Sequence, residues 1–94
     1  MPTYILLGTI SDEGTENLKN HPEWVDELNR DLESMGVKLL MQYAVLGPYD
    51  IVTIIEAPDN RTVVRVSAQL TLRGSVKVTT LPALPISDFL ASLK

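Results

Sequence analysis

A tight turn, Gly47-Pro48-Tyr49-Asp50, separates two apolar stretches in the middle of the chain and constrains the fold more than any other feature. Proline presets its own φ angle, and glycine adopts backbone conformations that other residues resist, so this pair reverses the chain. The flanking stretches 37–44 and 51–56 are rich in apolar and β-branched residues, which favours strands. The centre of the chain therefore predicts an antiparallel hairpin.

Two further strands and two helical segments flank this hairpin. The apolar run 4–9 predicts the first strand, and 75–81 predicts the fourth. The first helix is expected in two pieces, because Ser11 is a capping residue and Pro22 suits the first position of a second piece. Pro58-Asp59-Asn60 breaks the third strand and caps the second helix.

Apolar residues in both helical segments recur at spacings of three and four, which predicts one buried stripe on each. Gly36 is a natural stop for the first helix, and Arg73-Gly74 ends the second. The first stripe comprises Leu18, His21, Val25, Leu28, Leu32 and Met35, and the second comprises Val63, Val66 and Leu70.

The last residues form an extension of a single domain that spans 1–94. The segment Pro82-Ala83-Leu84-Pro85 is predicted to be extended, because its prolines are incompatible with a helix. Ser87-Asp88 then caps a short terminal helix that holds Phe89, Leu90 and Leu93.

The order of elements is β-α-β-β-α-β, the pattern of a ferredoxin-like α+β sandwich with a four-stranded antiparallel sheet. A sheet with one face in water alternates apolar and polar residues. The stretches 4–7, 39–41 and 51–55 are instead apolar on both faces. Because two helices cover only one face, the other needs a partner. We therefore predict a homodimer packed sheet to sheet as an α+β barrel.

Composition excludes several classes of function. The chain has no cysteine and one histidine, which removes disulfides, thiolate sites and multi-histidine metal sites. A net charge of −4 with eight scattered Lys and Arg residues argues against nucleic-acid binding. The start of the chain does not resemble a signal peptide, and no apolar run is long enough to span a membrane. We expect a soluble, cytoplasmic protein.

Tyr49 and Asp50 are the first candidate site, because a tyrosine and a carboxylate precede the most apolar strand. The carboxylate could bind a ligand amine or hydroxyl, or act as a base if burial raised its pKa. In the structural alternative, which we favour, Asp50 accepts hydrogen bonds from turn N–H groups and Tyr49 packs beside it.

His21 and Trp24 are the second candidate pair, since they could present neighbouring rings where the long helical segment begins. A histidine beside an aromatic ring could serve as a general base or stack on a flat ligand. A satisfied interior or boundary histidine is the more common outcome. Tyr43 lies late in the second strand and could point toward the same end of the sheet as Tyr49.

The residues 47–59, which read Gly-Pro-Tyr-Asp and then Ile-Val-Thr-Ile-Ile-Glu-Ala-Pro-Asp, resemble the GYD-domain proteins. The namesake motif of that family is a glycine, a variable residue and Tyr-Asp, leading into a strand that ends in Glu-Ala-Pro. Pro48 occupies the variable position here and should stiffen the turn. The stretches 4–7 and 74–80 also look like that family, so the resemblance covers nearly the whole chain.

This resemblance implies a ferredoxin-like, dimeric α+β barrel in a small bacterial or archaeal protein, and it brings no assigned reaction. The turn is also similar to the Gly-x-x-Asp hairpin of the ligand-sensing domains of Lrp/AsnC regulators, which lies near an effector site between dimers. No helix-turn-helix segment is present, so DNA binding does not carry over. Some dimeric α+β barrels are cofactor-independent monooxygenases, an analogy that holds only at the level of the fold.

Three hypotheses follow, and none needs a metal or a cofactor. The first is an oligomeric, non-enzymatic module that binds itself and an unknown small organic ligand near Tyr49 and Asp50. The second is a small cofactor-independent monooxygenase or isomerase that uses His21 with Trp24 in a cleft between helix and sheet. The third is an assembly subunit with no ligand. A cavity lined by His21, Trp24 and a tyrosine would favour the enzyme, and a polar niche at the hairpin would favour the module.

Overall fold

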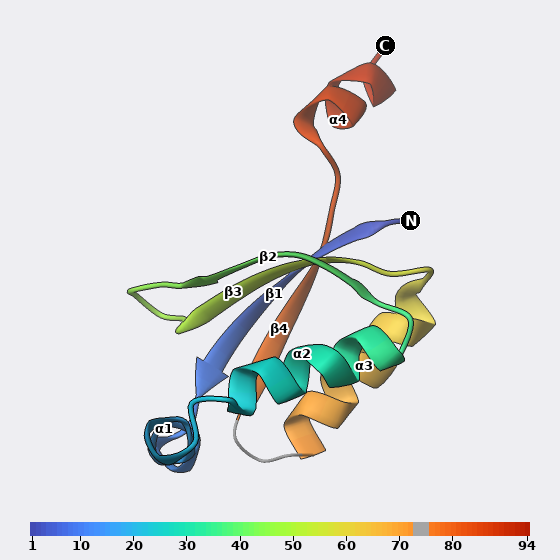
Figure 1. Cartoon of the computed structure of the whole chain (residues 1–94). Helices are drawn as coiled ribbons and strands as arrows, with labels where there is room; N and C mark the ends of the chain where they lie inside the picture. The colour runs from blue at the N-terminus through green and yellow to red at the C-terminus, as the bar shows by residue number, and fades with distance from the viewer. Residues whose placement is uncertain (73–75) are drawn as a thin grey trace.

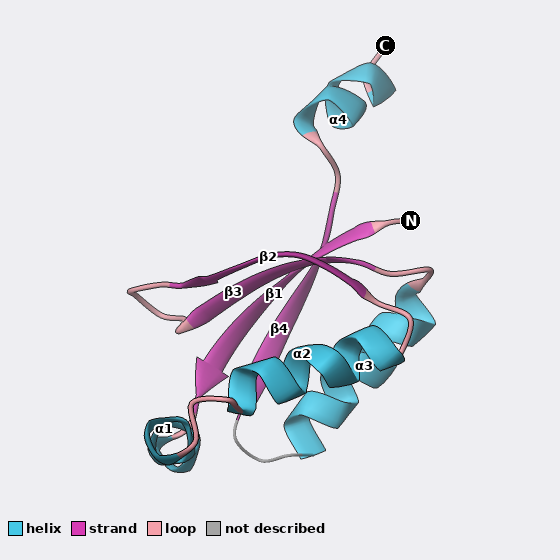
Figure 2. Ribbon diagram, viewed as in Figure 1, coloured by secondary structure: helices cyan, strands magenta, loops and turns pink. Residues whose placement is uncertain are grey.

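The computed structural model describes residues 1–72 and 76–94, and it confirms the α+β, ferredoxin-like prediction. Figure 1 and Figure 2 show a twisted four-stranded sheet with α2 and α3 against one face. The elements in chain order are β1 (Thr3–Ile10), α1 (Asp12–Asn20), α2 (Trp24–Ser34), β2 (Lys38–Ala44), β3 (Ile51–Glu56), α3 (Asn60–Leu72), β4 (Val76–Ala83) and α4 (Ile86–Ser92).

The sheet is antiparallel with the strand order β2-β3-β1-β4. The first strand therefore lies in the interior of the sheet, where it pairs with β3 on one side and β4 on the other. Thr3 lies opposite Glu56 in β3 and opposite Ala83 in β4. Strands that are far apart in the sequence thus become neighbours, as the ferredoxin-like order requires.

The hydrophobic core lies between the sheet and the helices α2 and α3. Alternate residues of the strands point into it, and the predicted stripes of both helices meet them. Ile55 and Val66 are fully buried at its centre. Its buried members are Tyr4, Leu6, Trp24, Leu28, Leu32, Val37, Ile55, Ala57, Val63, Val66 and Leu70.

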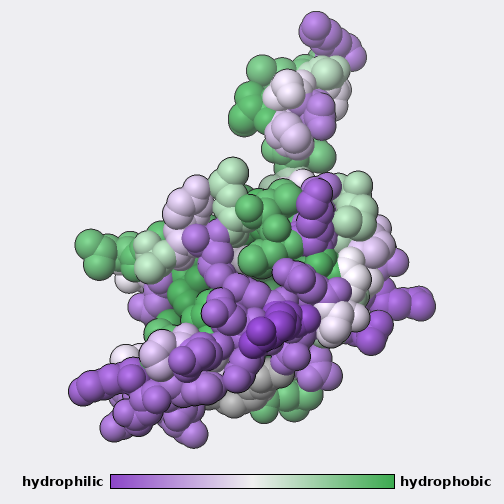
Figure 3. Space-filling view, viewed as in Figure 1, coloured by the Kyte–Doolittle hydropathy of each residue, from purple (hydrophilic) through white to green (hydrophobic). Residues whose placement is uncertain are grey.

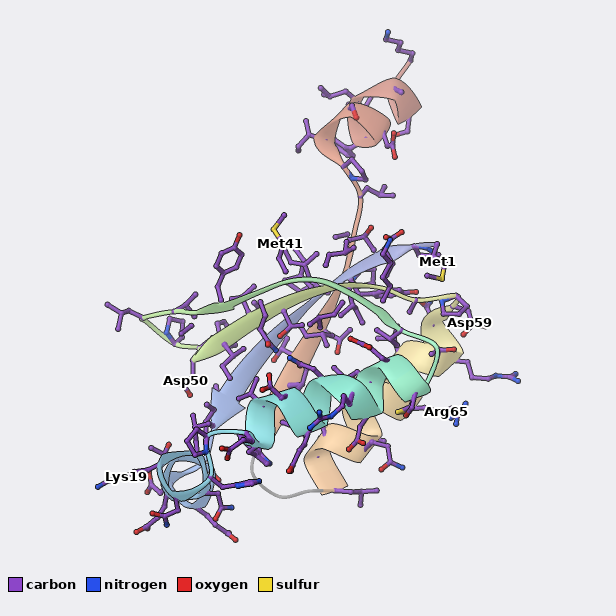
Figure 4. The ribbon with its side chains drawn as sticks, viewed as in Figure 1. Met1, Lys19, Met41, Asp50, Asp59 and Arg65 are labelled. Carbon is purple, nitrogen blue, oxygen red and sulfur yellow. The ribbon has the colours of Figure 1, made fainter. Side chains whose placement is uncertain are left out.

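Strand β2 contains an irregularity that determines which of its side chains face the helices. The register with β3 shifts between Leu39 and Met41, so Leu40 is an extra residue in the ladder. Without this bulge, Leu39 and Met41 would share a face. With it, Leu39 and Gln42 face the helices, while Met41 points away from them (Figure 4).

Three local predictions need correction. Pro22 precedes α2 rather than opening it, because Glu23 occupies the N-cap and the helix begins at Trp24. His21 is not part of the buried stripe: it ends α1, and its side chain is 53% exposed. The terminal helix begins at Ile86 with Pro85 as its N-cap, so Ser87 lies inside the first turn instead of capping it.

The predicted start of α1 agrees with the structure, whereas β4 runs two residues past its predicted end, to Ala83. The Ser11 hydroxyl accepts a hydrogen bond from the Gly14 amide at 2.9 Å, so Ser11 caps α1 as expected. The predicted stop at Arg73-Gly74 and the first residue of the predicted fourth strand, Ser75, lie outside the described residues. Among the residues that are described, no helix has the length and apolar character needed to cross a membrane.

Candidate functional site

The central turn is built as its sequence predicts. Gly47 has a φ angle of +113°, a conformation that side chains with a Cβ rarely adopt. The Val45 amide donates to the Asp50 carbonyl at 2.9 Å, and this bond closes the loop between β2 and β3. The turn therefore needs glycine at position 47 for backbone reasons alone.

Asp50 fastens this turn to the neighbouring strand. Its carboxylate Oδ2 accepts a hydrogen bond from the Ile10 amide at 2.7 Å, and its own amide donates to the Gly8 carbonyl at 2.8 Å. The carboxylate thus bonds to the end of β1, and no bond of this carboxylate to a turn amide is seen among the described residues. Tyr49 beside it is half-buried.

An open hollow lies between the hairpin and the helices α1 and α2. Its volume is about 330 Å³, and Tyr43 and Asp50 both border it. Its walls are mostly apolar, so a ligand there would meet few polar groups. The lining residues are Ile10, Leu18, Val25, Gln42, Tyr43, Ala44, Asp50 and Ile51.

A smaller cavity of about 50 Å³ lies deeper, between α2 and the sheet, and Trp24 lines it. It shares Val25, Gln42 and Ile51 with the hollow, so the two spaces are neighbours. A volume of this size holds one or a few water molecules, which each need about 10–15 Å³, and is too small for a drug-sized ligand.

Three polar side chains beside this cavity satisfy one another. Asn29 Nδ2 donates to Gln42 Oε1 at 2.9 Å, and Gln42 Nε2 donates to Asn29 Oδ1 at 3.2 Å and to Thr53 Oγ1 at 3.0 Å. Sequence reasoning missed this trio. The signal was a glutamine and a threonine in otherwise apolar strands, and the bulge at Leu40 turns the glutamine inward.

His21 lies apart from both spaces, between two glutamates on the surface. Its Nε2 is 3.0 Å from Glu27 Oε1, and its Nδ1 is 3.2 Å from Glu23 Oε2. The hydrogen bond with Glu27 and the charges of both carboxylates raise the pKa of the imidazole above its ordinary value. The protonated ring can donate from both nitrogens at once.

The structure brings together only part of the predicted site. Tyr43 and Asp50 border the same hollow, although the Tyr43 side chain points away from α2 and α3, and Trp24 lines the adjoining cavity. His21 and Tyr49 line neither space, so the cavity formed by His21, Trp24 and a tyrosine is not seen. In the described part of the chain, no group of three His, Cys, Asp or Glu residues is placed to hold a metal ion.

The face of the sheet away from α2 and α3, called the outer face below, is covered by no helix in Figure 1. It is apolar at its centre and more exposed toward the edges. Tyr43 is 54% exposed and donates from its hydroxyl to the Met41 sulfur at 3.2 Å. The apolar side chains that the register places on this face are Ile5, Leu7, Met41, Tyr43, Val52, Ile54 and Leu81.

Polarity divides the molecule into two sides. In Figure 3, hydrophobic residues gather over the sheet and α4, whereas hydrophilic residues gather over α1 and α2. Most of the 12 Asp and Glu residues of the chain lie in residues 12–33, although the whole chain has a net charge of only −4. One side is therefore suited to hydrophobic association and the other to charged contacts.

Comparison with known proteins agrees with the sequence motif. The model of the GYD domain matches residues 4–93. A protein of Thermus thermophilus, named "Glutamine synthetase and cystathionine beta-lyase binding protein", is 50% identical over 95 aligned residues, which cover the whole of both chains. The chain therefore belongs to the GYD-domain family.

Proposed function

We propose that this protein is a non-enzymatic binding module whose protein partner is a glutamine synthetase or a cystathionine β-lyase. The observation that carries the proposal is the similarity to the Thermus thermophilus protein, which is named for binding those two enzymes and aligns along its whole length. The candidate polar groups support binding over catalysis. The Asp50 carboxylate holds β1, and His21 lies on the surface between two glutamates.

We also propose that the module is a homodimer packed through its outer faces. The outer face carries the seven large apolar side chains named above and no helix covers it, and α4 adds the exposed Ile86, Phe89 and Leu90, an unusual surface for a monomer. One end of the face also carries Lys38 directly opposite Glu56 on the adjacent strand. A twofold dimer suits such a surface, because both copies use the same patch. Each copy then presents a lysine and a glutamate to the other.

In this dimer the enzyme would meet the acidic side formed by α1 and α2. Exposed carboxylates there include Asp12, Glu13 and Glu16 on α1. Surface charges of one sign steer a partner of opposite sign and act mainly on the association rate. Binding through this side should therefore weaken as salt is added.

The test is biolayer interferometry with the immobilised protein and each purified enzyme, taken from the organism that encodes this chain. We expect saturable binding of at least one enzyme and slower association at higher salt. The variant Glu13→Lys should slow association, whereas the matched variant Asp88→Lys on α4, which changes the net charge by the same amount, should not. Absence of binding to both enzymes would refute the proposal.

A small organic ligand in the hollow is a second candidate function. The observation that favours it is the 330 Å³ hollow bordered by Tyr43 and Asp50, a volume within the range of ligand pockets. Native mass spectrometry of freshly purified protein tests it, because a retained ligand adds mass to every protomer. Filling the hollow with Ala44→Phe should displace that ligand. Protein that carries no added mass would argue against this function.

A further inference from the structure

The last eleven residues, 84–94, form a projecting segment that we call the C-terminal arm. It contains α4, which stands clear of the sheet on the side away from α2 and α3 (Figure 1). None of the α4 residues is buried, and Phe89 and Leu90 are 48% and 53% exposed. The arm therefore contributes almost nothing to the core of its own protomer.

A helix of this kind needs a partner to be stable. Isolated helices shorter than about 12–15 residues are marginal in water, and α4 has seven residues. Its N-cap, Pro85, makes no side-chain capping bond. Its apolar residues nevertheless form one stripe at helical spacing, namely Ile86, Phe89, Leu90 and Leu93. Such a stripe stabilises a short helix when it packs on another apolar surface.

The backbone leads this stripe away from its own sheet. Strand β4 continues to Ala83, and Pro85 remains extended with φ −55° and ψ 143°. Two prolines, Pro82 and Pro85, restrict this connection, which therefore favours a straight exit over a reversal. The apolar stripe of α4 therefore stays exposed on its own protomer.

The two edges of the sheet differ in what they offer to such a stripe. On β2, Leu40, Met41 and Tyr43 are 41%, 53% and 54% exposed. On β4, Leu81 is 43% exposed, but the exposed residues Lys77 and Thr79 on the same face are polar. A twofold axis parallel to the strands would place β4 of one protomer over β2 of the other. The arm leaves β4 at the level of Lys38 and stands on the outer-face side of the sheet (Figure 1). It would then lie against the Lys38–Met41 end of the partner's β2, and the symmetry would repeat the contact.

We propose that the C-terminal arm crosses to a second copy of this chain and packs the apolar stripe of α4 against the partner's β2. The inference rests on the homodimer proposed above. It adds that each protomer is incomplete without the other, because the arm of each covers an edge of its partner. The stripe and the β2 edge are then buried together.

The absence of cysteine from the chain makes a direct test available. Two single-cysteine variants, Leu90→Cys and Met41→Cys, are mixed, allowed to exchange protomers and treated with a short bis-maleimide crosslinker. We expect a cross-linked heterodimer. The matched control replaces Met41→Cys by Val64→Cys, an exposed position on α3, and should give none. A cross-link formed within one chain, in dilute Leu90→Cys/Met41→Cys protein, would overturn the proposal.

Removing the arm gives an independent measurement. A chain ending at Ala83 keeps every core residue, and circular dichroism checks that it stays folded. Sedimentation should show that the dissociation constant of the dimer rises by about tenfold or more, a change of the size expected when a buried interface segment is lost. The variant Phe89→Glu should act in the same direction.

The outcomes separate this inference from the proposals on which it rests. A full-length protein that is monomeric at micromolar concentration refutes the homodimer, and the arm contact with it. A dimer of unchanged affinity after arm removal refutes the arm contact alone. If arm removal leaves the dimer intact and abolishes enzyme binding, the arm belongs to the enzyme interface and our inference is wrong.

Discussion

Asp50 and His21 are both polar residues at the ends of apolar elements, yet the structure uses them differently. The Asp50 carboxylate bonds to a backbone amide of β1, so it holds two strands in register. His21 lies on the surface between two carboxylates and contributes no buried contact. The sequence identifies both as unusual, but it does not reveal their partners, which lie 40 residues away for Asp50 and six or fewer for His21.

Replacing Asp50 by Asn should destabilise the fold without altering partner binding. An amide oxygen is a weaker acceptor than a carboxylate for the Ile10 amide, so we expect a loss of about 1 kcal/mol in the free energy of unfolding. Urea denaturation of Asp50→Asn measures this loss, with Asp88→Asn on α4 as the control. Equal stability of the two variants would contradict a structural role for Asp50.

His21 should titrate above the ordinary value of a histidine, because the Glu27 hydrogen bond and both carboxylates favour the charged ring. Since its pKa is raised by folding, this interaction stabilises the protein fully below the unfolded pKa and is lost as pH rises through the folded pKa. The chain has one histidine, so NMR follows its imidazole without assignment. The variant Glu27→Gln should lower the measured pKa, and an unchanged value would count against the pair.

Among the elements, α3 depends on a single capping residue. Asp59 Oδ1 accepts hydrogen bonds from the amide and the hydroxyl of Thr62, both at 2.8 Å. These bonds lower the pKa of the Asp59 carboxyl, so its contribution is present above the unfolded pKa and is lost as pH falls through the folded pKa. The sequence predicted this cap correctly from the Pro-Asp-Asn run.

We expect Asp59→Ala to lower the thermal midpoint by several degrees at neutral pH, because the first turn of α3 loses its acceptor. Asp59→Ser should retain most of the midpoint, since serine also caps helices. Differential scanning calorimetry at neutral pH and near pH 3 compares both variants with the parent. The difference in thermal midpoint between Asp59→Ala and the parent should shrink at the lower pH. A difference that stays constant with pH would show that the ionised Asp59 carboxylate is not what stabilises the helix start.

The remaining elements show where sequence reasoning succeeds and where it fails. Periodicity and turn residues predict the strands, the helices and their order, because these signals are local. The bulge at Leu40 gives no local signal in the sequence, because it arises from the pairing of β2 with β3. It turns the Gln42 side chain toward the helices, where it bonds to Asn29 and Thr53. The prediction that His21 belongs to the buried stripe was wrong for a related reason. This histidine fits the stripe by spacing, but α1 ends there, so the period is interrupted.

At the scale of the whole molecule, one face of the sheet builds the core, and the other is the outer face that we propose as the dimer interface. Ile55 is fully buried under the helices, whereas Ile54, its neighbour in β3, lies on the outer face. Both are isoleucines in one strand, so they form a matched pair. Variants at these two positions can therefore test the two faces of the sheet separately.

We expect Ile55→Ala to lower the free energy of unfolding by about 2–5 kcal/mol, the cost of a cavity in a packed core. Ile54→Glu should leave the protomer folded and shift it to the monomer, because a carboxylate would be buried between the sheets. Denaturation and sedimentation together distinguish the two effects. A dimer that tolerates Ile54→Glu would mean that the outer face is not the interface.

The central position of β1 has a consequence for the order in which the protein folds. The β2–β3 hairpin is local and can form early, on the microsecond timescale typical of hairpins. Strand β1 pairs with β3 and β4, and its contact with β4 joins Thr3 to Ala83. Loop closure over most of the chain delays this last pairing. A growing chain that has been synthesised as far as α3 therefore already contains three strands, but the edge of β1 that will pair with β4 is still open. Chaperone protection should matter most at this stage of synthesis.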